Sequence, residues 1–161
     1  MTADNPATSD WDRGTRELYA RLIEAWDKRN ARDFALLFAS NGNLIGFDGS
    51  QVNGQLEVGA HLTEIFTRHQ TPRYVSIVRD VRSLAGDVTI LRANTGLVPP
   101  GKDDIDPALN AVQSMVAVQK AGAWKITSFQ NTPAAFHERP DLVKKLTEEL
   151  RTRLRAMPAS K

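Results

Sequence analysis

The chain has 161 residues, a length that suits one domain with a buried core. Hydrophobic residues make up 41% and charged residues 25%, which is the composition of a globular protein rather than a disordered one. No apolar run approaches the roughly 18 residues that a membrane span needs, and the first ten residues lack the basic and apolar segments of a secretory signal. We therefore expect no membrane partner.

Charge and cysteine content narrow the function classes further. The chain contains no cysteine, which excludes disulfides and thiolate chemistry and favours the cytoplasm. The net charge is +2, from 21 basic and 19 acidic residues. Much of the basic excess lies late in the chain, where Lys and Arg alternate with Glu148, Glu149 and leucines rather than with aromatic residues. This pattern is typical of a solvated helix face, so we expect no nucleic-acid partner.

Helical periodicity in the first half predicts three helices and a short hairpin. The first helix carries an apolar stripe through Leu22 and Trp26, and Asn30 is placed to cap the second. Strand-forming residues then lead into the Asp48-Gly49 turn signal and a short return strand. The three helices are expected over residues 10–29, 31–38 and 55–70.

After Pro72 the hydrophobic period changes from 3.6 to 2, which predicts strands. Gly86 and Gly122 mark two hairpin connections, and a proline-rich, charged link at 99–108 predicts a long exposed loop between the middle strands. Pro140 is placed in the first turn of a final helix with a leucine stripe. The four strands are expected over residues 73–84, 87–98, 109–120 and 124–131.

This order of elements predicts an α+β fold, a cone-shaped and strongly curved antiparallel sheet with helices packed on its concave face. The expected divisions are a flexible N-terminus at 1–9, one domain at 10–135, a C-terminal amphipathic helix extension at 136–157 and a tail at 158–161. The last helix could pack on its own domain, clasp a second subunit or bind a partner. We prefer packing within a dimer, because an uncovered leucine stripe would be an exposed apolar patch.

The stretch FASNGNLIGFDGSQVNGQLEVGAHLTEIF and the ending WKITSFQNTP, in this order of elements, resemble the nuclear transport factor 2-like superfamily. Within it the chain is most similar to small SnoaL-like and ketosteroid-isomerase-like bacterial proteins, over residues 12–135. The resemblance implies a cystatin-like roll with a ligand pocket at the mouth of the cone, and a homodimer formed through the open sheet face. The resemblance is specific for fold but not for function, because one such cone hosts isomerases, cyclases, dehydratases, transport adaptors and plain binders.

Metal and cofactor motifs are absent from the sequence. His61, His69 and His137 show none of the spacings of a metal site, and there is no cysteine. Neither glycine-rich phosphate-binding motif occurs. We therefore expect no metal and no organic cofactor.

Cofactor-free proton transfer needs a carboxylate base and donors that stabilise an enolate oxygen. Asp48, at the front of the cone, is the candidate catalytic base, although Asp before Gly is also ordinary turn chemistry. Asp27 lies near the helix junction, where the enzymes that the chain resembles place acidic residues, but it is expected on an exposed edge. No tyrosine aligns with an isomerase's oxyanion-hole donor. Tyr19 lies on the first predicted helix, where packing against the core is enough to explain it.

Polar residues on the predicted strands form a candidate ligand-binding cluster. Strand alternation places Gln130 inward and Asn131 outward, and a single bulge would reverse the two. Arg92 and Gln113 could line the pocket or face a dimer interface, and both interpretations are open. The candidate ligand-binding residues are Trp26, Phe47, Phe66, Tyr74, Arg92, Asn94, Gln113, Met115, Gln130 and Asn131.

The sequence therefore predicts a protein that binds a small hydrophobic molecule in a cone pocket. A cofactor-free isomerase or cyclase acting on a hydrophobic carbonyl compound, such as a polyketide-like or steroid-like molecule, fits this interpretation. The alternative is a non-catalytic module that binds a ligand or mediates dimeric assembly.

Overall fold

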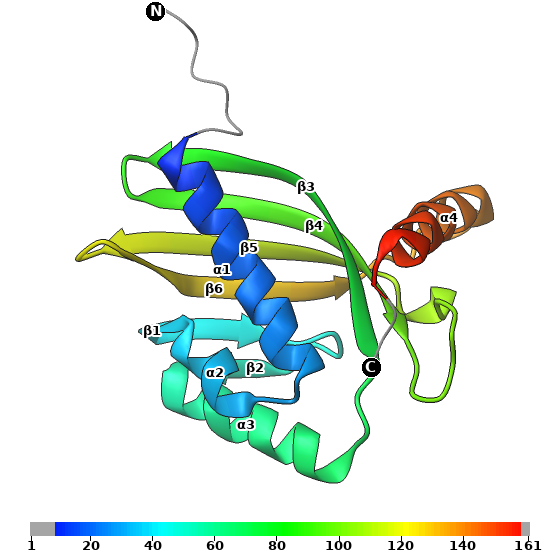
Figure 1. Cartoon of the computed structure of the whole chain (residues 1–161), viewed down its shortest axis with the longest axis horizontal. Coiled ribbons are helices and arrows are strands. Elements are labelled where there is room, and N and C mark those ends of the chain that lie inside the picture. Colours follow the sequence, from blue (N-terminus) through cyan, green and yellow to red (C-terminus); the bar gives the residue numbers. More distant parts are fainter. Residues whose placement is uncertain (1–8, 159–161) are drawn as a thin grey trace, which may run out of the picture.

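The computed structural model describes residues 9–158, which form helices, strands and one short 3₁₀ turn (Figure 1). Residues 1–8 and 159–161, which hold nearly all of the expected flexible N-terminus and tail, lie outside the described residues. In chain order the elements are α1 (Asp10–Asp27), α2 (Ala31–Leu36), β1 (Phe38–Ile45), β2 (Gln51–Asn53), α3 (Gln55–Arg68), β3 (Arg73–Ala85), β4 (Val88–Val98), η2 (Pro107–Leu109), β5 (Ala111–Lys120), β6 (Ala123–Pro133) and α4 (Pro140–Ala156).

The strands form one six-stranded curved sheet in the order β2-β1-β6-β5-β4-β3, so the predicted α+β fold is confirmed. Four of the five neighbouring strand pairs are antiparallel, but β1 and β6 run parallel. The sheet is therefore mixed rather than wholly antiparallel as predicted. The reason is topological. The chain leaves β1 through β2 and α3, and the last strand then enters the sheet between β1 and β5.

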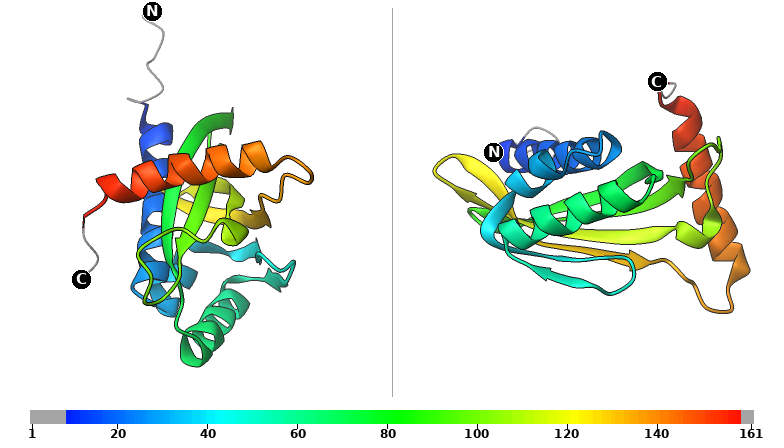
Figure 2. Two further views of the ribbon diagram at one scale, coloured as in Figure 1. Left: turned by 90° about the vertical axis from the view of Figure 1, so that its right-hand side faces the viewer. Right: turned by 90° about the horizontal axis from the view of Figure 1, so that it is seen from below.

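Helices α1, α2 and α3 lie on one face of the sheet, as the views in Figure 2 show. The apolar stripe of α1 supplies Leu18 and Leu22 to the main core, and α3 supplies Val58 and Leu62. From the sheet, the fully buried side chains of Phe38, Leu91, Met115 and Ile126 meet them. Burying each such side chain contributes about 2 kcal/mol, which is why the sheet presents this face to the helices.

Helix α4 packs on the opposite face of the sheet, across the ends of β3 and β4 (Figure 2). Of the arrangements that the sequence left open, the structure therefore has the last helix packed on its own domain. A second apolar cluster holds it there, made of Val75, Val98, Ile105, Leu146 and Leu150, with further apolar residues around it. A Cβ built on Gly96 of β4 would lie 3.0 Å from Leu150 Cδ1, so the absence of a side chain lets the helix approach the strand.

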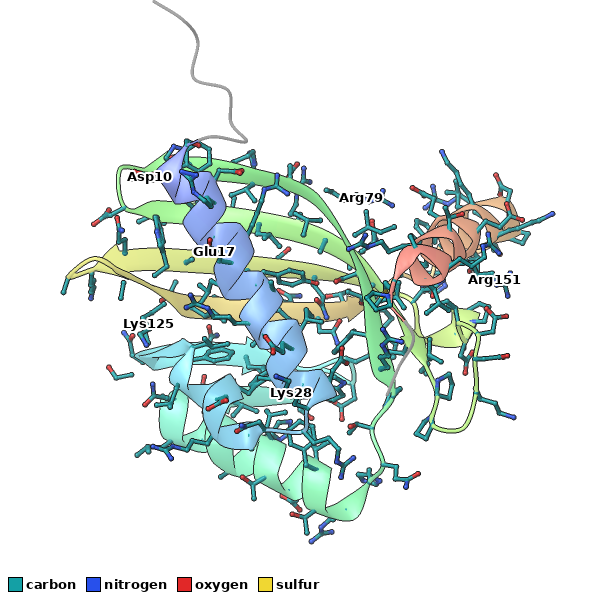
Figure 3. All side chains as sticks on the ribbon, in the orientation of Figure 1. Asp10, Glu17, Lys28, Arg79, Lys125 and Arg151 are labelled. Carbon is teal, nitrogen blue, oxygen red and sulfur yellow. The ribbon has the colours of Figure 1, made fainter. Side chains whose placement is uncertain are left out.

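Polar contacts fix the position of α4 along the strands. Arg79 on β3 forms an ion pair with Glu149, and Arg151 forms one with Asp104. Both arginines are labelled in Figure 3. These ion pairs are partly exposed and contribute little stability individually. The buried Asn110 Nδ2 donates to Thr147 Oγ1 over 2.9 Å, which ties the helix to the start of β5. Within residues 9–158, none of the helices is both long enough and apolar enough to cross a membrane.

Candidate functional site

A cavity of about 450 Å³ lies on the helix-covered face of the sheet. This volume falls within the range of ordinary small-molecule pockets. Its wall is made largely of apolar side chains from the helices and the inner strands, including Leu22, Phe34, Leu44, Leu62 and Phe129. Leu97 and Leu109, on either side of the loop after β4, close the side towards α4. The cavity can therefore surround an apolar molecule.

Five of the residues predicted from the sequence line this cavity: Trp26, Phe47, Asp48, Tyr74 and Asn131. Two of the predicted aromatic and sulfur-containing residues do not. Phe66 lies behind Trp26, with the two ring centroids 5.4 Å apart, and Met115 is fully buried in the main core. Those two residues support the wall without forming its surface.

A bulge in β6 decides which amide faces the cavity. Val116 pairs with Ser128 and Ala117 pairs with Ile126, so Thr127 is an extra residue in β6. Because one extra residue reverses the alternation that follows, Phe129 and Asn131 face inward and Gln130 faces outward. The prediction that Gln130 points inward is wrong; its amide is exposed and donates to Thr132 Oγ1 instead.

The predicted polar cluster is divided by the sheet. Arg92 is exposed on the outer face, where it forms an ion pair with Asp80. Asn94 lies on the same face and accepts a hydrogen bond from Arg79 Nε over 2.8 Å. Gln113 pairs with Ala93, so it belongs to the inner face and is fully buried. Of the two interpretations left open for Arg92 and Gln113, Arg92 fits the outer face and Gln113 fits the interior. The prediction that Asn94 contacts the ligand is wrong, because Asn94 lies on the face away from the cavity.

A chain of hydrogen bonds runs through the interior to the cavity. Tyr19 donates from its hydroxyl to Gln113 Oε1 over 2.6 Å. Gln113 Nε2 donates to Asn131 Oδ1 over 3.4 Å, and Asn131 Nδ2 donates to the Tyr74 hydroxyl oxygen over 3.5 Å. The last two residues line the cavity, so the chain connects the core to its wall.

Sequence reasoning missed the part played by Tyr19. The available signal was Gln113, a single amide on a strand face otherwise made of Ala111, Met115 and Ala117. A buried amide needs hydrogen-bond partners, and a tyrosine on the helix above such a face is a suitable one. The periodicity alone could not pair the two residues, because they are distant in the sequence.

Burial sets the protonation of both tyrosines. Loss of hydration raises the pKa of Tyr74 to about 12, with hydrogen bonds from Gln113 and Asn131 opposing the increase and the negative charge of Asp27 adding to it. Burial also raises the pKa of Tyr19 far above its usual value. Both hydroxyls are therefore neutral hydrogen-bond donors at physiological pH.

Asp48 lies at the edge of the cavity, in the turn between β1 and β2, and is exposed. Its Oδ1 accepts from the backbone N–H of Ser50 over 2.9 Å. Hydrogen bonding to the side chain and backbone of Ser50 lowers the pKa of Asp48, and the charge of the nearby His61 adds a smaller decrease. This is the environment of a turn residue, since a base in an apolar cavity would have a raised pKa.

Asp27 stands outside the cavity lining, at the end of α1. Its Oδ1 accepts from the backbone N–H of Tyr74 over 3.0 Å, which fixes the start of β3 against the helix. Partial burial of the carboxyl raises the pKa of Asp27, and this hydrogen bond opposes the increase. Asp27 therefore holds the backbone of a residue that lines the cavity.

Among the described residues, no group of three or more His, Cys, Asp or Glu side chains could hold a metal ion. His61 and His69 both line the cavity from α3 and its C-terminal end. The polar chemistry of the cavity wall thus rests on neutral hydroxyl and amide groups, with Asp48 and the two histidines as its ionisable groups.

No protein-family model matches the sequence, and no curated protein matches it. Solved structures do match. A domain of unknown function with a cystatin-like fold from Nostoc punctiforme is 19% identical, with a TM-score of 0.75, over 93% of this chain and 100% of that one. An NTF2-like protein of unknown function from Shewanella oneidensis is 15% identical, with a TM-score of 0.62, over 74% and 97%.

A ketosteroid isomerase-like protein from Erwinia carotovora atroseptica is 12% identical, with a TM-score of 0.61, over 76% of this chain and 95% of that one. At these identities the matches show the fold alone. The chain has the cystatin-like fold, which it shares with NTF2-like and ketosteroid isomerase-like proteins, and the resemblance in the sequence is confirmed at this level.

Proposed function

We propose that this protein binds a small, neutral, hydrophobic molecule in the cavity between α1, α3 and the inner face of the sheet. The observation that supports the proposal is the composition of the cavity wall. About 450 Å³ are lined mainly by apolar side chains, and Tyr74 and Asn131 contribute neutral polar groups. A wall of this kind takes up apolar surface, and a few polar groups orient the ligand.

A neutral fluorescent dye, Nile red, tests the proposal. We expect its emission to increase on binding, with the fluorescence of Trp26 in the cavity wall quenched. Ile65→Trp, on the cavity side of α3, should fill the space and abolish binding. Thr63→Trp is the matched control, because Thr63 is exposed on the same helix and should leave binding unchanged. Equal binding by both variants would contradict the proposal.

Cofactor-free proton transfer on a carbonyl compound is the second candidate function. It is favoured by one observation: Asp48 and His61 line the same cavity as the Tyr74 hydroxyl. A base and a hydroxyl donor are the two kinds of group that this chemistry needs. Because Asp48 is exposed and its pKa is lowered, we rank binding without catalysis first.

Exchange of carbon-bound hydrogen in D₂O separates the two candidates. If Asp48 is a base, trans-2-decalone should incorporate deuterium next to its carbonyl faster with the protein than without it, as measured by mass spectrometry. Asp48→Asn should then abolish the exchange and leave Nile red binding intact. No acceleration by the unmodified protein would refute the catalytic candidate and leave the binding proposal standing.

A cytoplasmic homodimer is part of the same proposal. Helix α4 covers the outer ends of β3 and β4, so the face available to a second copy is the outer side of β1, β6 and β5. Val112 on this face is 38% exposed, and Val112→Lys should shift the mass in light scattering from dimer to monomer. Leu84→Lys, at the exposed end of β3, is the control that should keep the dimer. A monomer before any substitution would contradict this part of the proposal.

A further inference from the structure

The hydrogen-bond chain between Tyr19 and the cavity has a direction. Tyr19 is 2% exposed, and its hydroxyl oxygen lies 2.6 Å from Gln113 Oε1. The Tyr19 proton is given to Gln113 Oε1, which turns the carbonyl oxygen of this amide towards α1. Only the NH₂ group of Gln113 is then left to face β6 and the cavity.

The same direction passes through the second amide. Asn131 Oδ1 accepts from Gln113 Nε2, so the NH₂ group of Asn131 is the end that faces Tyr74. The Tyr74 oxygen therefore accepts from an amide donor, Asn131 Nδ2. Among the described residues the Tyr74 hydroxyl donates to no protein acceptor, and Tyr74 lines the cavity.

We propose that Tyr74 selects the ligand by donating its hydroxyl proton to an oxygen that only accepts hydrogen bonds, such as that of a ketone, an ester or an ether. This inference rests on the proposed function, because it concerns a ligand in the same cavity. Tyr74 is the specificity-determining residue. Tyr19 is a positioning residue that acts through Gln113 and Asn131, and neither amide has a free carbonyl directed at the ligand.

An alcohol is disfavoured by the same geometry. Its oxygen can accept from Tyr74, but its own proton then needs an acceptor. The Asn131 carbonyl is turned towards Gln113 and its NH₂ group faces Tyr74, and the surrounding wall is largely apolar. A buried hydroxyl proton without a partner weakens binding by roughly tenfold or more. The cavity should therefore distinguish two ligands that differ only in the oxidation state of one carbon.

Three compounds with one ring skeleton test the proposal: trans-2-decalone, the corresponding decalol and trans-decalin. Their affinities are measured by displacement of Nile red from the whole protein. We expect the ketone to bind roughly tenfold more tightly than the alcohol. Tyr74→Phe should remove this preference and leave the affinity for decalin unchanged, because the hydrocarbon makes no hydrogen bond.

Tyr19→Phe provides a second variant outside the cavity. Without the Tyr19 proton, Gln113 can turn over, Asn131 can follow, and Tyr74 can accept from the ligand instead of donating. The preference should shift towards the alcohol, which a purely structural role of Tyr19 would not cause. Thr15→Val is the matched control, since it removes a buried hydroxyl on the same helix that bonds Thr89, outside this chain. It should leave the preference unchanged.

The outcomes separate this inference from the proposed function. Nile red binding with equal affinities for the ketone and the alcohol, or with no displacement by the ketone, would overturn the role of Tyr74 and leave the pocket intact. A preference for the alcohol in the unmodified protein would also overturn the inference, because Tyr74 would then accept from the ligand and both amides would be turned over. Absence of Nile red binding would overturn the proposed function and this inference with it.

Discussion

Leu150 on α4 connects the stability of the fold to the shape of the cavity. Its side chain is fully buried between β4 and the loop that follows β4. Leu150→Ala removes three buried carbon atoms, each worth about 0.8 kcal/mol, which gives a transfer loss of about 2.4 kcal/mol. The space left behind raises the expected loss in the free energy of unfolding to about 3 kcal/mol. Urea denaturation followed by circular dichroism measures this loss.

The same substitution should weaken Nile red binding. Ile105, which packs with Leu150, belongs to the loop that carries two cavity-lining residues at its ends, Leu97 and Leu109. A loosened α4 therefore leaves that side of the cavity less well defined. Leu56→Ala is the control, because Leu56 is 89% exposed and its substitution should change stability by less than about 0.5 kcal/mol. A loss below about 1 kcal/mol for Leu150→Ala would refute the view that α4 is an integral part of the domain.

Two further predictions concern protonation. Because the pKa of Tyr74 is raised to about 12 and that of Tyr19 is also raised, the neutral forms stabilise the fold fully below about pH 10, and this stabilisation is lost as the pH rises further. Absorbance at 295 nm should therefore increase together with alkaline unfolding rather than near pH 10, and an independent increase near pH 10 would refute the burial of the two hydroxyls. The raised pKa of Asp27 gives stability that is fully present below its unfolded pKa and lost as the pH rises through the folded value. Asp27→Asn keeps an oxygen for the Tyr74 N–H and should reduce this decline in urea denaturation between pH 3 and pH 7, whereas an unchanged decline would contradict the assignment.

Regular periodicity made most of the fold predictable. The stripe through Leu22 and Trp26 and the change of period after Pro72 correspond to α1 and to β3–β6 in the structure. The parallel contact between β1 and β6 could not be predicted in the same way, because pairing between strands depends on where the chain returns and leaves no local pattern. The packing of α4 was open for a similar reason. An apolar stripe has to be covered, but the sequence of the stripe does not show which surface covers it.

The candidate site was predictable in its apolar part and not in its polar part. Trp26, Phe47 and Tyr74 come from elements whose orientation follows from periodicity, and they line the cavity. The amides of β6 depend on the bulge at Thr127, which has no glycine or proline to mark it in the sequence. The facing of a polar residue after such a bulge is settled by tertiary packing alone.

The bulge and the hydrogen-bond chain depend on each other. If β6 alternated regularly after Ile126, Gln130 would face inward and Asn131 would lie on the outer face. Gln113 Nε2, in a fully buried side chain, would then lose the Asn131 carbonyl as its acceptor. A buried amide group without its hydrogen bond costs about 1–3 kcal/mol. The extra residue therefore does more than turn one side chain: it allows Tyr19, Gln113 and Asn131 to share one continuous chain that ends at Tyr74, in the cavity wall.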